Sequence, residues 1–558
     1  MNIKQLYNDP SDITFESYLK LKGVKDIENY VVPRGKYIEN PLLFENIEYA
    51  VDEIKYWCLL SEQETVVIYI VVDSDLDGYT SATILYQYLI LLCPTLTIKF
   101  LIHTSKQRGL DDKAIMDRIE NDRPDLVIVP DAGTNNRKQA KQLTEMSIAL
   151  ITLDHHDIEE DKIVQDGYLI TNQVGNVDRN GSGCAVTFQF MRAMDFMFDV
   201  KYASRFLDMV ALSTVSDSMN VTSMQNREYL YWGMMKEGSI TNNFLKALMD
   251  KFIGKDDFTQ RDISFKIVPK FNAVVRTDNM ELKQRVIKAM IGMDDVDEVA
   301  DLCKKAHENQ IKTVNSILEE VKEDVDTESS VIVYQSESIP RSYSGLVAGK
   351  FLNVFGGKPS IVGSSHDGYM IGSLRSPIPL KDILSKCEYV DFASGHDMSC
   401  GVGLKVENID KLKEHLDSLN LSYSTDTEVL LSSTIKNIPK RLFSEFEPYT
   451  TLWGKGLEKP LFHIKPFTIN SNTISVLGAN KRTLKFSKDG VDFLIFMCTN
   501  EQKERLHIGE DKKNCKLSIE CVVELGTNEF RGKVTNQCII VDFEATIKDS
   551  KKEVEDIL

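Results

Sequence analysis

The chain has 558 residues, far more than one hydrophobic core usually supports, so we expect two to four domains. Its hydrophobic content of 42% and charged content of 27% are ordinary for a globular protein, and no stretch approaches the roughly 20 apolar residues that cross a bilayer. These values and the polar start, without a secretory signal, predict a cytoplasmic protein with no membrane segment. The net charge of -18 argues against a generally basic nucleic-acid coat but leaves room for a local basic groove.

The first part of the chain repeats a strand-loop-helix pattern, which is typical of a parallel α/β sheet. Residues 64–93 begin with the apolar segment TVVIYIVV, continue through a polar loop and end in an apolar helix. Further strands are predicted at Leu96–Ile102, in DLVIVP and in SIALITLD, with helix-compatible residues at 111–121. Open parallel sheets place their sites beyond the carboxyl ends of the strands, so the residues that follow these segments are candidates for chemistry.

The rest of the chain changes character twice. MELKQRVIKAMIGM and a longer amphipathic run after it predict a helical connector, and VIVYQ predicts the first strand of a second α/β domain. From about residue 430, short alternating segments separated by turn residues predict a small antiparallel barrel. We therefore expect four parts, which are residues 1–235, 236–325, 326–425 and 426–558.

Acidic and imidazole side chains directly follow four apolar segments. Asp73 and Asp75 lie in the loop DSDLDG, where alternate residues of an extended chain face the same side. Taken alone, such a pair is more often a solvated turn with a helix cap. Asp131, the triplet Asp154-His155-His156 and Asp217 occupy the same kind of position, although each by itself could be a turn or a cap. Together they supply the mixed ligands that suit Mn²⁺ or Mg²⁺ better than a structural zinc.

The series DSDLDG, PDAG, LDHH and VSDSMN resembles the four motifs of the DHH phosphoesterase superfamily, and the remainder resembles its bacterial RecJ branch. Pro269, Asn272 and Arg276 match a linker segment of that branch, RSYSGLVAGKF, GSLRSP and SGHDMSCG resemble blocks of its DHHA1 domain, and EPYTTLWGKGLEKPLF resembles the entry to its oligonucleotide-binding barrel. The similarity runs in order over nearly the whole chain. It implies an α/β fold with a parallel-sheet DHH domain, a helical connector, an α/β DHHA1 domain and a C-terminal antiparallel OB-like barrel.

The resemblance also implies two divalent cations, Mn²⁺ in the first place and Mg²⁺ as the alternative. The ligands that it implies are Asp73, Asp75, Asp131, His155 and Asp217. By the same resemblance, Asp73 would bind one cation and Asp75 the other, Asp131 would be shared by both, and His155 and Asp217 would complete the ligands of the second. Two cations about 4 Å apart lower the pKa of a shared water and clamp the attacking and leaving oxygens of an in-line displacement.

Three residues receive catalytic roles by the same resemblance. Besides the bridging Asp131, His156 is free to contact the scissile phosphate or assist proton transfer, and Asp154 holds an imidazole in place. Asp77 is expected to be structural and to order the loop ahead of Gly78.

Substrate binding is expected in the second α/β domain and the connector. The candidates are Arg276, Arg341, Arg375, Gly395 and His396. Small residues around His396 permit close backbone approach to an anion, although such a turn could equally hold a satisfied histidine. Arg276 could instead be a packing or salt-bridge residue of the connector. Ser394 and Cys400 depart from the Gly and Ala that are usual in this block, which affects the fine geometry of the loop.

In the barrel, Lys481, Arg482, Lys485 and Phe486 are candidates for phosphate contacts and base stacking on a single strand. A solvated hairpin is the equal alternative for these residues.

The expected function is a metal-dependent exonuclease that hydrolyses single-stranded DNA, from 5′ to 3′, in DNA repair, recombination or replication. Polarity and the choice of DNA rest on the resemblance alone. The first alternative is a DHH phosphodiesterase of short oligonucleotides or cyclic dinucleotides, but such relatives carry a His where this chain has Tyr69. The second is an inactive scaffold that binds single strands or replication proteins. We expect a monomer that binds single-stranded DNA and works with a helicase or single-strand-binding protein.

Overall fold

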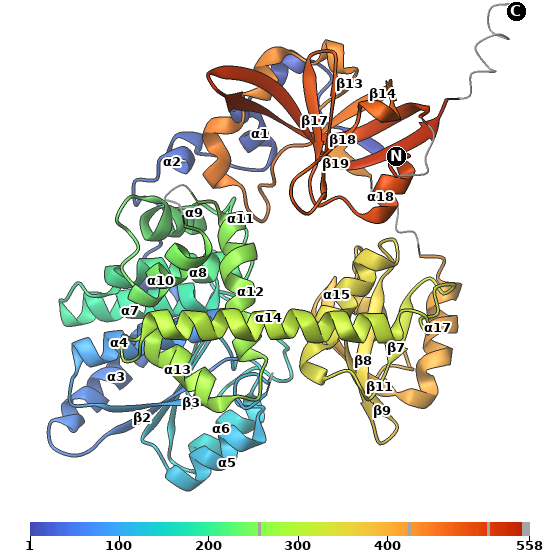
Figure 1. Cartoon of the computed structure of the whole chain (residues 1–558). Coiled ribbons are helices and arrows are strands. Elements are labelled where there is room, and N and C mark those ends of the chain that lie inside the picture. The colour runs from blue at the N-terminus through green and yellow to red at the C-terminus, as the bar shows by residue number, and fades with distance from the viewer. Residues whose placement is uncertain (106, 255–257, 422–425, 510–513, 549–558) are drawn as a thin grey trace, which may run out of the picture. The chain divides into compact units, whose positions relative to one another are not determined.

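The computed structural model describes residues 1–105, 107–254, 258–421, 426–509 and 514–548 (Figure 1). The chain divides into two compact units. The larger unit comprises residues 33–219 and 223–423, and the barrel unit comprises residues 1–32, 220–222 and 424–558. Residues 1–32, which we predicted as part of the first domain, thus group with the C-terminal region. Within the described ranges, no helix is both long and apolar enough to cross a membrane.

The larger unit begins with a five-stranded parallel sheet, as the sequence predicted. Its strands, in spatial order, are β3 (Thr97–Ile102), β2 (Val67–Val72), β4 (Leu126–Pro130), β5 (Ala149–Asp154) and β6 (Tyr168–Thr171). The central strands are buried along nearly their whole length, which explains why they read as continuous apolar runs rather than as alternating ones. All their carboxyl ends meet at one edge of the sheet.

Helices flank this sheet. They are α3 (Ile47–Ser61), α4 (Leu76–Leu92), α5 (Lys113–Asp122), α6 (Arg137–Glu145), α7 (Gly183–Phe198), α8 (Leu207–Ser216) and α9 (Met224–Leu230). Helix α4 starts at the site edge, where the Asp75 side chain accepts a hydrogen bond from Gly78 N and caps it. It packs against α7 and α8, so three helix termini lie close to the carboxyl ends of the strands.

The predicted connector is helical. It contains α10 (Asn243–Phe252), α11 (Gln260–Asp262), α12 (Val268–Val275), α13 (Met280–Met290) and the 26-residue α14 (Val296–Val321), with a π-helical turn at Ile263–Ile267. Helix α14 packs on α10, α12 and α13, and it also contacts α15 of the region that follows (Figure 1).

The second α/β region has a mixed five-stranded sheet in the order β10 (Phe392–His396), β11 (Ser399–Lys405), β9 (Tyr369–Arg375), β8 (Ser360–His366) and β7 (Ile332–Gln335). Strands β7 and β8 are parallel and the other pairs are antiparallel. Its helices are α15 (Ser344–Val354), α16 (Lys381–Ser385) and α17 (Ile409–Ser418).

The barrel unit confirms the predicted C-terminal β domain. Its main sheet has seven strands in the order β13 (Ser432–Ser433), β14 (Phe462–Asn470), β18 (Lys516–Phe530), β19 (Lys533–Ile547), β17 (Val491–Ile495), β16 (Thr483–Lys488) and β15 (Ser475–Leu477), with α18 at Asn500–Arg505. Most pairs are antiparallel, whereas β17–β19 and β13–β14 are parallel.

The N-terminal segment belongs to this unit through backbone and aromatic contacts. Strand β1 (Ile3–Gln5) pairs with β12 (Thr427–Val429), and α1 (Phe15–Leu21) and α2 (Ile27–Val31) follow it. The ring of Phe15 stacks on Tyr449, and the Tyr18 hydroxyl donates to the carbonyl oxygen of Glu458. These contacts bury the apolar side of α1.

Candidate metal centre

The predicted ligands come together at the carboxyl edge of the parallel sheet. Asp73 and Asp75 follow β2, Asp131 follows β4, and His155 follows the end of β5. Asp217 arrives differently, because the apolar segment in front of it is helix α8, of which it forms the C-terminal cap. The shared position beyond an apolar segment therefore predicted proximity correctly, although one of the segments is not a strand.

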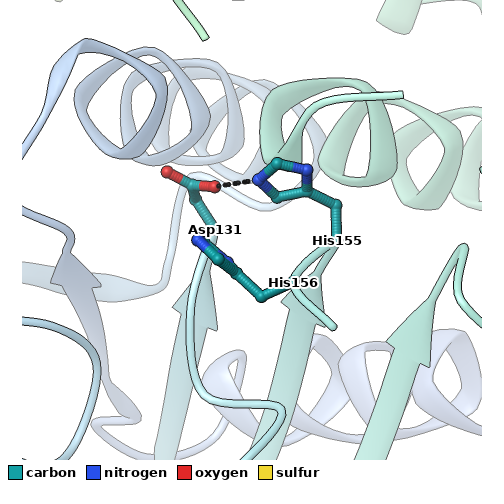
Figure 2. Close-up of side chains that lie close together, drawn as sticks. All are labelled: Asp131, His155 and His156. Carbon is teal, nitrogen blue, oxygen red and sulfur yellow. Dashed lines mark ion pairs between the residues drawn. The ribbon is translucent and has the colours of Figure 1, made fainter. Parts of the chain in front are cut away.

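His155 lies at the centre of these carboxylates. Its Nε2 is 3.3 Å from Asp131 Oδ1, as Figure 2 shows, 3.5 Å from Asp217 Oδ2 and 3.9 Å from Asp77 Oδ2. Ligand atoms of Asp73, Asp75 and Asp131 form a second group, in which they lie within 4.8 Å of one another. Asp131 thus belongs to two groups of candidate ligands, one with His155 and His156 and one with Asp73 and Asp75, as a bridging residue would. A third group joins His155 with Asp77 and Asp217.

The position of Asp131 depends on an unusual backbone conformation and on a glycine. Its φ is 65°, in the left-handed region, and its N–H donates to the carbonyl oxygen of Leu153 at 2.7 Å. A non-glycine residue adopts this conformation at a cost, which is typical of functional sites. A Cβ on Gly183, the first residue of α7, would overlap the Asp131 carboxylate. The start of α7 therefore provides the space that this side chain occupies.

Asp77 lies in the same cluster but is heavily hydrogen-bonded. Its carboxylate accepts from the backbone N–H groups of Gly183 and Cys184, both at 2.9 Å, and from Ser213 Oγ at 2.5 Å. These bonds tie α4 to the N-terminus of α7 and to α8, although Asp77 also forms a group of candidate metal ligands with His155 and Asp217. Because its Oδ2 also faces His155, Asp77 adds negative charge to the centre.

Burial and mutual repulsion disfavour the charged forms of these carboxylates. Burial, followed by the charge of Asp75, raises the pKa of Asp73 to about 7 and that of Asp77 to about 6. Burial, followed by the charge of Asp77, raises the pKa values of Asp131 and Asp217 well above the usual range. Burial and the positive charge of His156 lower the pKa of His155 to about 3, so its ring is neutral.

This arrangement fits a divalent cation. Asp131 Oδ1 is buried and accepts no hydrogen bond from the described residues, although the neutral His155 ring lies beside it. A cation between the imidazole nitrogen and the carboxylate oxygen would be coordinated by both and would offset the buried negative charge. Carboxylates with one or two imidazoles are a donor set that binds Mn²⁺ and Mg²⁺.

His156 points to a different partner from His155. Its Nδ1 is 2.7 Å from Asp154 Oδ1, and Asp154 also accepts from Thr134 N and His155 N. Burial alone would lower the pKa of His156, but Asp154 outweighs it and raises that pKa to about 9. Burial would raise the pKa of Asp154, but the charge of His156 and the hydrogen bonds hold it well below its usual range. The two side chains therefore form an ion pair with a buried carboxylate, as the predicted role of Asp154 requires.

Arg108 is a site residue that the sequence did not reveal. Its Nη1 is 3.2 Å from His156 Nε2. Desolvation lowers the pKa of Arg108, but the nearby carboxylates of Asp73, Asp75 and Asp131 outweigh it and raise the pKa overall. A single arginine in the loop after β3 carries no pattern, so only the fold could place it in the site.

A buried lysine holds the loop that carries Arg108. Lys283 of α13 is 1% exposed, and its Nζ donates to the carbonyl oxygens of His103 and Thr104, both at 3.0 Å. Farther along the loop, Gly109 N donates to Asp73 Oδ1 at 3.2 Å. The connector thus supports the metal centre through hydrogen bonds to this loop.

The structure brings together some of the predicted substrate-binding residues. Burial, followed by the charge of Arg375, lowers the pKa of Arg276, which also feels the Asp75 carboxylate. Arg375 is the last residue of β9, and its side chain lies against the start of α15, where a Cβ on Gly345 would be 2.7 Å from Arg375 Nη2. Desolvation and the charges of Arg108 and His156 lower the pKa of His396. Arg276 and His396 therefore feel charged residues of the metal centre, and Arg375 is connected to it only through its interaction with Arg276.

The other two candidates are less closely connected. Gly395 precedes His396 in β10 with a φ of 128°, a conformation that favours glycine, and it lies opposite Cys400. Arg341 is exposed at the start of the short 3-10 helix Arg341–Tyr343, and no described contact joins it to the centre.

The barrel residues that we predicted as nucleic-acid contacts are only partly suited to this role. Phe486 is 3% exposed and stacks on Phe493 inside the barrel, so it belongs to the core and not to a stacking surface. Lys485 forms an ion pair with Asp492 at 2.8 Å. Lys481 and Arg482 are exposed in the loop before β16.

Comparison with known families identifies the domain with the parallel sheet and the C-terminal β domain. The family model described as "DHH family, N-terminal domain" matches residues 66–214, which hold every predicted metal ligand except Asp217. The model described as "RecJ OB domain" matches residues 432–542. The chain thus carries a domain that matches the DHH family and a second domain that matches the RecJ OB model.

Relatives match over nearly the whole chain. The SPbeta prophage protein YorK of Bacillus subtilis (strain 168), named as a candidate single-strand DNA-specific exonuclease, is 25% identical over 98% of both chains. The single-stranded-DNA-specific exonuclease RecJ of the same organism is 23% identical over 90% of this chain and 64% of its own length. Two crystal structures of RecJ from Thermus thermophilus cover 98% of this chain. The complex with Mn²⁺ has a TM-score of 0.75 at 18% identity over 78% of that chain, and the complex with Mg²⁺ has 0.67 at 16% over 77%.

These likenesses confirm the predicted fold of a RecJ-like chain: a parallel-sheet DHH domain, further mixed α/β structure and a C-terminal OB domain. The acidic clusters around Asp131 fit the divalent cations that the Thermus RecJ structures contain.

Proposed function

We propose that this RecJ-like chain is a metal-dependent exonuclease that hydrolyses the phosphodiester bonds of single-stranded DNA. The observation that carries the proposal is the buried group of carboxylates around the neutral His155, with Asp131 shared between two sets of ligands. The names of the relatives and the RecJ OB domain support single-stranded DNA as the substrate. We propose in addition that digestion runs from 5′ to 3′ and that the enzyme acts in DNA repair, recombination or replication.

Two cations, Mn²⁺ or Mg²⁺, would be held by Asp73, Asp75, Asp131, His155 and Asp217. When bound, such ions lower the pKa of a water and stabilise the charge that develops on the phosphate oxygens. Asp131 would contact both cations, because it belongs to one group of ligands with His155 and His156 and to another with Asp73 and Asp75. His155 stays neutral and offers Nε2 as a ligand.

His156 and Arg108 would bind the scissile phosphate. With His156 protonated, its Nε2–H and the Nη1–H of Arg108 are two donors only 3.2 Å apart, and neither can accept from the other. A phosphate oxygen would satisfy both at once. Asp154 keeps His156 charged and fixes the direction of its ring, so that the proton on Nε2 is available to the phosphate or to the leaving oxygen.

Arg276 and Arg375 would bind a second phosphate of the same strand, with His396 and Gly395 lining the route and Arg341 nearer the exterior. The charge of Arg375 disfavours the charged form of Arg276, and a phosphate would supply the counter-ion that relieves this repulsion. Asn272 Oδ1 and Ser344 Oγ, close to these residues in the chain, are buried and make no hydrogen bond among the described residues.

The test is a degradation assay with Mn²⁺ on end-labelled single-stranded DNA, duplex DNA, RNA and a dinucleotide. We expect stepwise loss of single-stranded DNA from its 5′ end, with Asp131→Ala at least about 100-fold slower and Asp117→Ala, on the exposed face of α5, unchanged. Preference for the dinucleotide would assign the chain to phosphodiesterases of small substrates. Binding of single strands without any metal-dependent cleavage would identify a scaffold.

Partners and assembly complete the proposal. We infer a monomer that receives single strands from a helicase or a single-strand-binding protein. Size-exclusion chromatography with light scattering tests the first part, and stimulation of the nuclease by such proteins tests the second.

A further inference from the structure

A buried histidine and a buried aspartate join the two ends of the loop that carries Arg108. This loop connects β3 to α5 and comprises residues 103–112, of which residue 106 lies outside the described ranges. His103 is its first residue and is 1% exposed, and Asp112 is its last residue and is 3% exposed. Their side chains meet at 2.8 Å between Nδ1 and Oδ2. Neither residue belongs to the predicted metal ligands or to the proposed phosphate contacts.

The protons of this pair have one arrangement. Burial, opposed by the hydrogen bond and the charge of Asp112, lowers the pKa of His103, so its ring is neutral near neutral pH. A carboxylate only accepts hydrogen bonds, so the single ring proton lies on Nδ1 and is donated to Asp112. Nε2 is then an acceptor, and it is buried without a partner among the described residues. An apolar side chain would avoid this cost, so filling of the core does not explain a histidine here.

Asp112 uses its two carboxylate oxygens for different contacts. Oδ1 accepts from Ala114 N at 2.9 Å and caps the N-terminus of α5, whereas Oδ2 accepts from His103. A serine would cap the helix about as well. The second oxygen therefore serves only the contact with His103, which fixes the end of β3 against the start of α5.

The loop is also held on both sides of Arg108. Before it, Ser74 Oγ donates to the carbonyl oxygen of Ser105 at 3.2 Å. After it, Leu110 N donates to Asn136 Oδ1 at 2.9 Å. These bonds tie the loop to its surroundings, but they do not fix the separation of its ends. The contact between the first and the last residue does so.

We propose that His103 and Asp112 are a positioning pair for Arg108, because their contact fixes both ends of the loop and thereby the place of the guanidinium. Arg108 Nη1 is 3.2 Å from His156 Nε2, and a displacement of about 1 Å in such a group can lower a rate by about 100-fold. The inference rests on the proposed function, since it assigns the pair to the binding of the scissile phosphate. The pair acts through Arg108 and not by contact with the substrate.

The first experiment removes only the contact between the two side chains. Asp112→Ser retains a capping oxygen for α5 but leaves no acceptor for His103. We expect kcat/KM for single-stranded DNA to fall by about tenfold or more, with the Mn²⁺ affinity retained in calorimetric titration. Asp295→Ser, at the N-cap of α14, is the matched control and should behave like the unsubstituted chain. Full activity of Asp112→Ser would overturn the proposal.

A conservative variant provides the rescue. The amide N–H of an asparagine can take the place of Nδ1–H, so His103→Asn should keep the contact with Asp112 and most of the activity. His103→Leu, which has no donor, should lose activity as Asp112→Ser does. Equal activity of His103→Asn and His103→Leu would contradict the proposal.

Further variants separate positioning from folding. Asp112→Ser leaves the ring N–H of His103 buried and unpaired, so its melting temperature should fall. The double variant His103→Leu/Asp112→Ser has no unpaired ring, so its melting temperature should recover while its activity stays low. In the Arg108→Gln background, Asp112→Ser should change kcat/KM by less than about twofold, because the pair then has no guanidinium to position. Recovery of activity together with stability, or an undiminished loss in the Arg108→Gln background, would identify a purely structural pair.

Hydrogen exchange tests the pair without any cleavage. Peptides that cover residues 107–112 contain the amides of Gly109 and Leu110, which donate to Asp73 and Asn136. These amides should exchange faster in Asp112→Ser than in the unsubstituted chain or in Asp295→Ser. A chain that shows this change but hydrolyses no substrate would contradict the nuclease and retain the restraint of the loop by the pair. A nuclease in which Asp112→Ser alters neither exchange nor activity would do the reverse.

Discussion

Gly183 lies against the carboxylate of Asp131 so closely that a Cβ at this position would overlap it. The backbone of Asp131 is itself held in the left-handed region of φ, so this residue has little freedom to move away. A methyl group could be accommodated only by moving Asp131 or the start of α7.

Gly183→Ala should therefore disable the metal centre. We expect kcat/KM for single-stranded DNA to fall by about 100-fold or more, since misplaced ligands no longer hold the cations in the arrangement that catalysis needs. Calorimetric titration with Mn²⁺ should show weaker binding. Gly349→Ala in α15, where the nearest atom to the new Cβ is 4.0 Å away, is the control and should keep both properties. Full activity of Gly183→Ala would show that the centre tolerates movement of Asp131.

The metal-free chain should lose stability as the pH rises. The folded-state pKa of Asp73 is about 7 and those of Asp131 and Asp217 are raised well above normal, whereas unfolded aspartates titrate near 4. His155, with its pKa lowered to about 3, opposes this effect, but the several raised carboxylates outweigh it. The folded state thus binds more protons between roughly pH 4 and 7, and the free energy of unfolding falls over this range, by an amount on the order of 2 to 4 kcal/mol.

Thermal unfolding in EDTA across this pH range is the measurement. Mn²⁺ should abolish most of the fall in melting temperature with pH, because the cations take the place of protons on the buried carboxylates. Asp73→Asn should flatten the curve without metal, whereas the exposed Asp117→Asn should not. A melting temperature that stays level or rises with pH in EDTA would contradict the described electrostatics.

Arg108→Gln should separate substrate binding from metal binding. The variant loses the charge that faces the phosphate position but none of the proposed ligands, so Mn²⁺ affinity should be retained or improve slightly. We expect kcat/KM to fall by about 100-fold. Arg118→Gln on α5, an arginine paired with Asp122, provides the comparison and should behave like the unsubstituted chain. Loss of Mn²⁺ binding in Arg108→Gln would show that the residue is needed to assemble the centre.

Lys283→Met should weaken the support of the loop that carries Arg108. Two carbonyl groups lose their donor, at a cost of about 1 to 3 kcal/mol for each buried group left unsatisfied, and the segment that carries Arg108 becomes less well placed. Activity should fall more than the remaining folded fraction explains, with Mn²⁺ affinity nearly intact. Lys288→Met, an exposed lysine of the same helix, serves as the reference. A drop in activity that merely parallels the loss of folded protein would remove the positioning role.

Much of the fold and of the metal centre could be predicted, because both depend on local patterns. Buried parallel strands produce continuous apolar runs, and the residues after them, such as Asp73, Asp131 and His155, must meet at one edge.

The prediction of a stacking role for Phe486 was wrong, although buried and more exposed side chains alternate along its strand. Leu484 and Phe486 are both buried, so the ring had to face the core.

Other parts depend on contacts that no local pattern reveals. Arg108 acquires its partner from a distant strand end, and Lys283 reaches its carbonyl groups across 180 positions of the chain. Residues 1–32 group with the C-terminal region because their partners lie more than 400 positions away. From sequence alone, such a segment is assigned to the domain that follows it in the chain, whereas in the folded protein it packs against residues that are distant in the chain.

The pairing of β1 and α1 with the C-terminal barrel has a consequence for synthesis of the protein. Tyr18 leaves the ribosome well before its partner Glu458, which follows it by 440 positions. At about 5 to 20 residues per second, roughly 20 to 90 s pass before that partner is made. During this interval the apolar side of α1, with Phe15 and Leu19, stays uncovered while the DHH domain can already form its own core. Helix α1, although translated long before the barrel, is among the last parts to reach its native contacts, which makes it a natural place for a chaperone to bind the nascent chain.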